Sequence, residues 1–205
     1  MPLQNRVDPF GELFADTSRG LFVGNRGGRF HRDDRTLGSR RWASRQWICC
    51  RLAFNNRHRE VWGRGYSELF FLDEPTALSA GHRPCFECRR KDAQVFAERW
   101  MHAFSLSEPP AATDMDRRLH AERLEGRSKR SHTASIDELP DGTFVIWDNG
   151  ASAIRGLSLL RWTPSGYTAC APRPRGVIAD VLTPPAIVRV LAAGYAPQWH
   201  PSALA

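Results

Sequence analysis

The feature that most constrains this chain is a pair of cysteines, Cys85 and Cys88, in the segment FFLDEPTALSAGHRPCFECRRKD, residues 70–92. Two residues separate the thiols at the expected start of a helix, so both can face one ion, and the helix amides there favour thiolate charge. A thioredoxin-like redox pair requires a βαβ setting, and the surroundings predict hairpins instead. Half of a tetrahedral zinc site therefore fits better, with two ordinary packing residues as the alternative.

Short apolar runs between glycines predict a small antiparallel sheet before the cysteine pair. RQWICCRLAF, residues 45–54, alternates in polarity and places Cys50 on the strand face of Ile48. GLFVGNRGGRFH, residues 20–31, indicates a hairpin around its paired glycines. REVWGRGYSELFFLD, residues 59–73, predicts two further strands.

Helix signals follow the sheet. Asp73 is expected to cap a short helix that stops at Gly81, and a second helix is expected to begin near Cys88. A third is predicted at about residues 114–124, and a terminal helix is expected to begin behind Thr183 as its cap.

The second half of the chain reads as a different unit. EGRSKRSHTAS, residues 125–135, is polar and basic and predicts a mobile loop, and Asp-Gly and Asn-Gly turns at 139–167 predict short strands. The expected fold class is α+β. Residues 1–107 would form a small antiparallel sheet with helices around a zinc knuckle, and residues 108–205 a smaller β-rich unit with a C-terminal helix.

The charge balance favours an anionic partner. The net charge is +7, and nearly all of the positive charge is arginine, since Lys91 and Lys129 are the only lysines. Arginines crowd residues 26–59 with tryptophans between them, a pattern that attracts phosphate backbones. The alternative is a solvated basic face whose arginine bias reflects GC-rich coding.

Residues 45–92 resemble the metal-binding domain of the Ada adaptive-response protein. The likeness rests on an aromatic strand end, a helix ending in Ala-Gly, and Arg-Pro-Cys-x-x-Cys followed by basic residues. The rest of the chain resembles an uncharacterised bacterial family. In the Ada-type domain four cysteines hold zinc, and one accepts a methyl group from a methylated DNA phosphate. The resemblance therefore implies zinc as cofactor and DNA as partner.

The resemblance carries over only part of the ligand set. Cys85 and Cys88 match the second pair of ligands, but the first pair, Cys-x-x-x-Cys, is absent. Counting back without a gap puts one ligand at His58 and the other at Phe54, which cannot bind metal, so Cys50 is the nearest replacement. With fewer cysteines than the family pattern, self-methylation is not expected. The expected metal ligands are Cys50, His58, Cys85 and Cys88, with Cys49, His82 and His31 as substitutes.

The predicted function is zinc-dependent binding of nucleic acid, DNA above RNA, in repair or modification. Cations around a helix N-terminus favour phosphate, and aromatic rings can stack on unpaired bases. A core role is the alternative for the tryptophans. The expected contact residues are Arg83, Arg89, Arg90, Lys91, Trp47 and Tyr66, with Trp42 as a further candidate.

An enzyme acting on DNA or a nucleotide, a glycosylase or nuclease, is the alternative function. His31 with Asp33 and Asp34 could hold Mg²⁺ or supply an acid and a base, and Glu68 could act from a cleft. A solvated turn and the exposed face of a strand are the simpler interpretations. Asp116 and His120, one helical turn apart, form a further candidate pair. A zinc-stabilised scaffold that binds another protein is the third hypothesis.

The cellular location of the protein is predicted from targeting and membrane-spanning patterns that the sequence does not show. The sequence shows no signal-peptide pattern and no apolar run near the ~20 residues that span a bilayer. Five cysteines, an odd number, argue against a disulfide framework, and Cys170 is expected to be inert. A cytoplasmic protein without a membrane partner is therefore expected.

Overall fold

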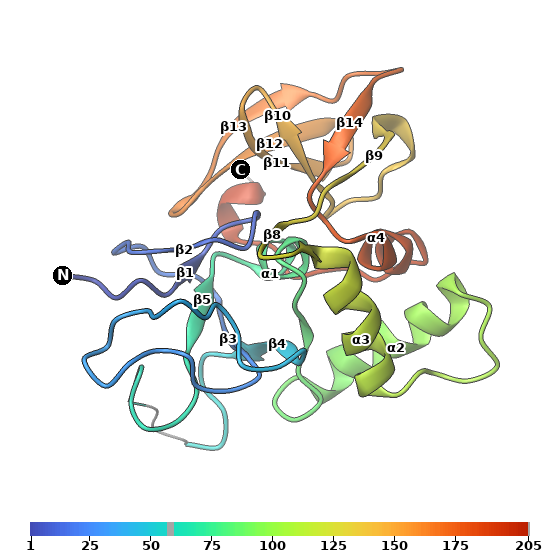
Figure 1. Ribbon diagram of the computed structural model, residues 1–205. Coiled ribbons are helices and arrows are strands. Elements are labelled where there is room, and N and C mark those ends of the chain that lie inside the picture. Colours follow the sequence, from blue (N-terminus) through green and yellow to red (C-terminus); the bar gives the residue numbers. More distant parts are fainter. Residues whose placement is uncertain (57–59, 205) are drawn as a thin grey trace.

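The computed structural model describes residues 1–56 and 60–204 as a mixed α+β protein (Figure 1). Two six-stranded sheets and four α-helices form its framework, with a small two-stranded ribbon beside them. The predicted α+β class is confirmed at this level.

The first sheet has the strand order β2-β1-β5-β3-β4-β6. It is mixed rather than purely antiparallel, because β1 pairs in parallel with β5 and β4 pairs in parallel with β6. The expectation of an antiparallel sheet therefore holds for its centre, where β3 lies between β4 and β5, and for the edge pair of β1 with β2. Its strands are β1 (Arg6–Val7), β2 (Leu13–Phe14), β3 (Phe22–Arg26), β4 (Trp47–Arg51), β5 (Leu69–Phe71) and β6 (Arg83–Pro84).

The hairpin predicted at residues 20–31 is wrong, and of the two strands predicted at residues 59–73 the structure has one, β5. Gly27 and Gly28 do end β3, with φ of +79° and +157°, but residues 27–46 form a long excursion before β4 begins. Ala43 and Ser44 return the chain by donating their N–H groups to the carbonyl of Arg26. Residues 60–66 hold turns rather than strands.

The helices follow their sequence signals closely. The four are α1 (Glu74–Ser79), α2 (Arg90–Ala103), α3 (Ala112–Arg123) and α4 (Pro185–Ala192). Asp73 caps α1 by accepting from the N–H of Thr76 at 3.0 Å, and Gly81 follows the helix with φ of +85°. Thr183 is not the cap of α4, because its hydroxyl instead accepts from the N–H of Phe144 at 2.9 Å.

The second sheet has the order β13-β12-β11-β10-β14-β9. Asp148 and Asn149, with φ of +49° and +57°, form the tight turn between β10 and β11, as a two-residue hairpin requires. Its strands are β9 (His132–Ser135), β10 (Phe144–Trp147), β11 (Gly150–Arg155), β12 (Ser158–Thr163), β13 (Gly166–Pro172) and β14 (Ile178–Val181), and short 3₁₀ turns lie at η1 (Ile136–Glu138) and η2 (Pro201–Ala203).

The predicted loop at residues 125–135 is instead ordered into strands. β7 (Leu124–Glu125) and β8 (Ser128–Lys129) form the ribbon, and β9 pairs with β14. The sequence did not indicate these strands for two reasons. The segment is polar, and the strand that pairs with β9 lies more than 40 residues further along the chain.

Packing is continuous across the predicted domain boundary at residue 107. Helices α2, α3 and α4 share one core with Leu78 of α1, and Figure 1 places them beside one another below the second sheet. Trp162 of β12 also donates to the hydroxyl of Thr76 in α1 at 3.1 Å. The division at 107 stays a prediction.

Among the described residues, no helix has both the length and the apolar character that crossing a bilayer requires.

Candidate metal centre

Three cysteines from two separate segments converge on one point. Cys50 comes from β4, and Cys85 and Cys88 come from the turn between β6 and α2. All three are buried, and their Sγ atoms lie within 4.8 Å of one another. Parallel pairing of β4 with β6 brings the segments together, since the N–H of Cys85 donates to the carbonyl of Cys49 at 3.0 Å.

The geometry of this cysteine cluster suits a metal ion. Thiolates bound to tetrahedral zinc at about 2.3 Å lie about 3.8 Å from one another, within the separation seen here. The backbone N–H of Glu87 donates to Cys85 Sγ, and that of Arg51 donates to Cys88 Sγ, each at 3.4 Å. Such donors stabilise negative charge on sulfur. The buried cluster can therefore bind a metal ion.

Proton sharing within the cluster is uneven. The pKa of Cys85 is lowered, because its sulfur accepts hydrogen bonds from the Cys50 and Cys88 thiols. The pKa of Cys50 is raised, because it donates to both neighbouring sulfurs and is buried. A negative sulfur is thus stabilised in the cluster even before a cation adds its own attraction.

Cys49 and His82 lie on the other face of the sheet. The Sγ of Cys49 accepts from Nη1 of Arg89 at 3.5 Å, and burial raises the pKa of this thiol. His82 is buried against Trp47 and Phe71, with ring centroids 5.0 Å and 4.7 Å away. Neither residue is a ligand in this arrangement, although both were expected substitutes.

His31 is also removed from the cluster. Its Nδ1 lies 2.7 Å from the hydroxyl of Ser67 and its Nε2 lies 2.9 Å from the carbonyl of Gly63. The ring stacks on Trp62 at 5.3 Å, so His31 organises a loop. His58, the remaining predicted ligand, lies outside the described residues.

A cavity of about 340 Å³ opens beside the cysteine cluster. Glu68 lines it and is 7% exposed, and its Oε2 accepts from the N–H of Trp62 at 2.9 Å. Tyr66, more than half exposed, lines the same cavity. The structure thus places the predicted catalytic Glu68 and the predicted base-stacking Tyr66 next to the candidate metal centre. We call this cavity the cysteine pocket.

The other predicted catalytic residues do not converge. Asp33 is exposed and forms an ion pair with Arg29. Asp34 accepts from the N–H and the hydroxyl of Thr36 at 3.0 and 2.7 Å, and these hydrogen bonds lower its pKa. Both aspartates stabilise an exposed turn, while the ring of His31 points inward.

Arg83 and Arg89 are interior residues, each 1% exposed, which removes them from the predicted phosphate surface. Arg83 donates from Nε and Nη2 to the two carboxylate oxygens of Asp116, both at 2.8 Å. Arg89 pairs with Glu74 at 2.8 Å and with Asp92 at 2.9 Å. Their guanidinium groups hold the fold together in this structure.

Of the other predicted nucleic-acid contacts, two are exposed and one is buried. Arg90 and Lys91 are exposed at the start of α2, whereas Trp47 is 2% exposed.

The predicted Asp116–His120 pair does not form. Asp116 binds Arg83 instead, and the Nδ1 of His120 lies 2.9 Å from Nη2 of Arg123.

The sequence did not indicate Asn25 and Glu87 as pocket residues. Asn25 pairs with Ile48 across β3 and β4, so it shares the face of Cys50, and Glu87 lies between the two later cysteines. Strand alternation alone would have placed Asn25 there once the pairing of β3 with β4 was known.

The sequence matches no protein-family model, and no curated protein or solved structure matches it. The case for a metal therefore rests on the geometry of the cysteine cluster. The likeness of residues 45–92 to the Ada-type domain stays a prediction.

The adjacent cysteines Cys49 and Cys50 provide a matched test of the metal centre. Cys50→Ser or Cys85→Ser is expected to lose bound metal, because each removes one of three thiolates, whereas Cys49→Ser is expected to keep it. Elemental analysis of protein purified without chelator measures this directly. Metal-free wild-type protein, or equal metal in Cys49→Ser and Cys50→Ser, would contradict the assignment.

The buried pair of Arg83 and Asp116 predicts a stability effect. Arg83→Leu should destabilise the fold by about 3–5 kcal/mol, because it leaves a buried carboxylate without its partner. Chemical denaturation measures this, with the exposed Arg90→Leu as the control, expected within about 0.5 kcal/mol of wild type. Equal stability of the two variants would contradict a stabilising role for the buried Arg83–Asp116 pair.

Proposed function

We propose that this protein binds zinc through Cys50, Cys85 and Cys88 and binds nucleic acid, DNA in the first instance. The observation that carries the proposal is the convergence of these three buried thiols from segments 35 residues apart. Their position beside exposed cations at the start of α2 links the ion to a basic surface.

Zinc is the metal that the donor set favours. Thiolates select zinc, copper(I) or iron–sulfur clusters, and clusters are usually held by four cysteines rather than three. A zinc ion here would order the turn between β6 and α2, from which Arg90 and Lys91 project into solvent. In small zinc sites this ordering is itself folding free energy.

The nucleic-acid surface that we propose is centred on residues 27–46, the arginine segment. It contains six arginines and two acids, and Arg32, Arg40 and Arg45 are exposed. Trp42 is partly exposed among them and can stack on an unpaired base. This surface takes the role first expected of Arg83 and Arg89. The Ada-type likeness of residues 45–92 supports DNA as the polymer.

Binding through the arginine segment predicts a strong dependence on salt. Replacing Arg32, Arg40 and Arg45 together by alanine should reduce the slope of log K against log salt by roughly 0.9 for each duplex phosphate that the variant no longer neutralises. Fluorescence anisotropy with labelled single- and double-stranded oligonucleotides measures this slope.

The matched control replaces Arg19, Arg175 and Arg189, three exposed arginines outside the segment, and changes the net charge equally. It should leave most of the salt slope intact. Equal effects in the two triple variants would mean that net charge, rather than the arginine segment, accounts for the salt dependence. An absence of salt-sensitive binding would refute the proposal.

A zinc-dependent enzyme acting on DNA or a nucleotide is the second candidate function. The specific observation in its favour is that the cysteine pocket brings Glu68 beside the candidate metal centre. A zinc ion with an open coordination position acts as a Lewis acid. Glu68, held in place by the N–H of Trp62, could accept or donate a proton in the same cavity.

Glu68→Gln separates the two functions. If the protein is an enzyme, the variant should lose about 10²–10⁴-fold in turnover while it keeps its metal and its affinity for DNA. Denaturing gels with plain, abasic and alkylated oligonucleotides report the product. Unchanged turnover in the variant excludes Glu68 as the acid or base.

A further inference from the structure

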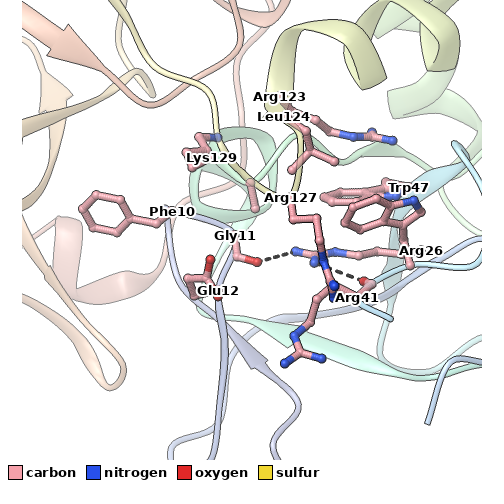
Figure 2. A pocket seen from close by; sticks show the side chains of 12 residues that line it. Phe10, Gly11, Glu12, Arg26, Arg41, Trp47, Arg123, Leu124, Arg127 and Lys129 are labelled. Atoms are coloured by element: carbon pink, nitrogen blue, oxygen red, sulfur yellow. Dashed lines mark hydrogen bonds between the residues drawn. The ribbon is translucent and has the colours of Figure 1, made fainter. Parts of the chain in front are cut away.

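A second cavity, of about 210 Å³, lies on the sheet face opposite the cysteine cluster. Figure 2 shows the side chains that line it. Strand alternation explains the separation, because Trp47 of β4 faces this cavity and Ile48 faces the cysteine pocket. Cations reach the cavity from four places in the chain, so we call it the cation pocket. They are Arg26, Arg41, Arg123, Arg127 and Lys129.

Trp47 is the centre of the cation pocket. The Cζ atoms of Arg26 and Arg123 lie 3.9 and 3.8 Å from the centroid of its ring. Figure 2 places the two guanidinium groups on either side of the indole. Cation–π contacts hold both arginines in place without neutralising them.

The buried cations of this pocket are bound by neutral groups. Arg26 donates to the carbonyls of Gly11 at 2.7 Å and Arg41 at 3.3 Å. Arg123 donates to the carbonyls of Gly81 at 2.9 Å and Arg45 at 2.8 Å.

Lys129, which is half-buried, donates to the carbonyl of Ser79. Within residues 1–56 and 60–204, no carboxylate forms an ion pair with Arg26, Arg123 or Lys129. The Nε of Arg123, a residue 1% exposed, has no hydrogen-bond partner.

This arrangement is electrostatically unfavourable without an anion. Burial and repulsion from Arg26 and Arg123 lower the pKa of Lys129 to about 7, and burial lowers the pKa of Arg26 to about 9. The acids that act on Arg26 are Glu12, an exposed residue at the lining of the pocket, and Asp8, whose pKa burial raises to about 6. Asp116 acts on Arg123 but is already paired with Arg83. Buried charges are normally paired, so the pocket has an excess of uncompensated positive charge.

We propose that the cation pocket binds the terminal phosphate of a nucleotide or of a nucleic-acid strand. A phosphomonoester carries about −1.5 to −2 charges at pH 7, which suits several converging cations better than a carboxylate or a phosphodiester does. Arginine forks match phosphate oxygens geometrically. The cavity is smaller than the roughly 300 Å³ of most small-molecule sites, so it admits a phosphate rather than a whole nucleotide.

An adjoining cavity supplies room for the rest of the ligand. It measures about 320 Å³ and shares Arg41, Trp42 and Arg127 with the cation pocket. Trp42 is partly exposed there and offers a ring on which a base can stack. Binding of the terminal phosphate of a nucleic-acid strand rests on the proposed nucleic-acid function. Binding of a free nucleotide does not depend on that function.

Two paired probes test the inference at fixed salt. One pair is an oligonucleotide with and without a 5′-phosphate, and the other is adenosine 5′-monophosphate against adenosine. The phosphorylated member of at least one pair is expected to bind at least tenfold more tightly by isothermal titration calorimetry.

Variants of the pocket should remove this preference. The ratio of the affinities for the phosphorylated and unphosphorylated probes should fall to about one in Arg127→Gln and in Lys129→Met. Arg127 is exposed, so its substitution tests the pocket without disturbing the core. Arg175→Gln, an exposed arginine between β13 and β14, is the control and should keep the preference.

Proton uptake provides a second readout. Arg26, Arg123, Asp8, His82 and His132 are the charged or titratable groups that interact with Lys129. A bound phosphate should raise the pKa of Lys129 above 7, so binding at pH 8 should take up a proton. The binding enthalpy would then depend on the ionisation enthalpy of the buffer in wild type and not in Lys129→Met.

The outcomes separate this inference from the proposed function. Binding of adenosine 5′-monophosphate without any oligonucleotide binding would confirm the pocket and refute the nucleic-acid function. Oligonucleotide binding that ignores the terminal phosphate, with adenosine and its monophosphate equal, would overturn the pocket and leave the nucleic-acid function standing.

Discussion

A buried ion pair between Glu74 and Arg89 holds the parts of this protein together. Glu74 begins α1 and Arg89 immediately precedes α2, and their charged groups meet at 2.8 Å with 1% of each side chain exposed. Glu74 also accepts from the hydroxyl of Tyr195 at 2.6 Å and from the N–H of Gln198 at 2.9 Å. One carboxylate therefore fixes the turn that carries Cys88 against both α1 and the C-terminal segment.

The contrast between paired and unpaired arginines gives this highly basic chain two kinds of buried cation. Arg83 and Arg89 each meet a carboxylate, which offsets the cost of removing them from water. Arg26 and Arg123 meet carbonyls and an indole ring instead. The first kind joins separate segments of the fold. The second kind has no carboxylate ion-paired with it in the described part of the chain, and this difference is the physical basis for the proposed cation pocket.

Local signals were sufficient for part of the fold and of the site. The cap at Asp73 and the stop at Gly81 depend on neighbouring residues, so the sequence predicted α1 nearly to the residue. Alternation along residues 45–54 placed Cys50 on one strand face, and that face carries the cysteine cluster. Each inference needed only a short window of sequence.

Contacts between residues far apart in the sequence could not be predicted from such windows. Arg83 looked like a surface cation because nothing near it in sequence reveals Asp116, which lies 33 residues away. Charge alone cannot distinguish a buried, paired side chain from a solvated one.

The two candidate sites depend on the register of a single strand. Asn25 pairs with Ile48 and Arg26 with Trp47 across β3 and β4, which directs Cys50 to one face and Trp47 to the other. A slip of one residue would exchange the faces, because side chains alternate with a period of two. The thiol would then leave its partners Cys85 and Cys88, and the indole would leave its flanking arginines. A metal that fixes Cys50 therefore also fixes the strand on which the cation pocket is built, although no ligand need pass between the two faces.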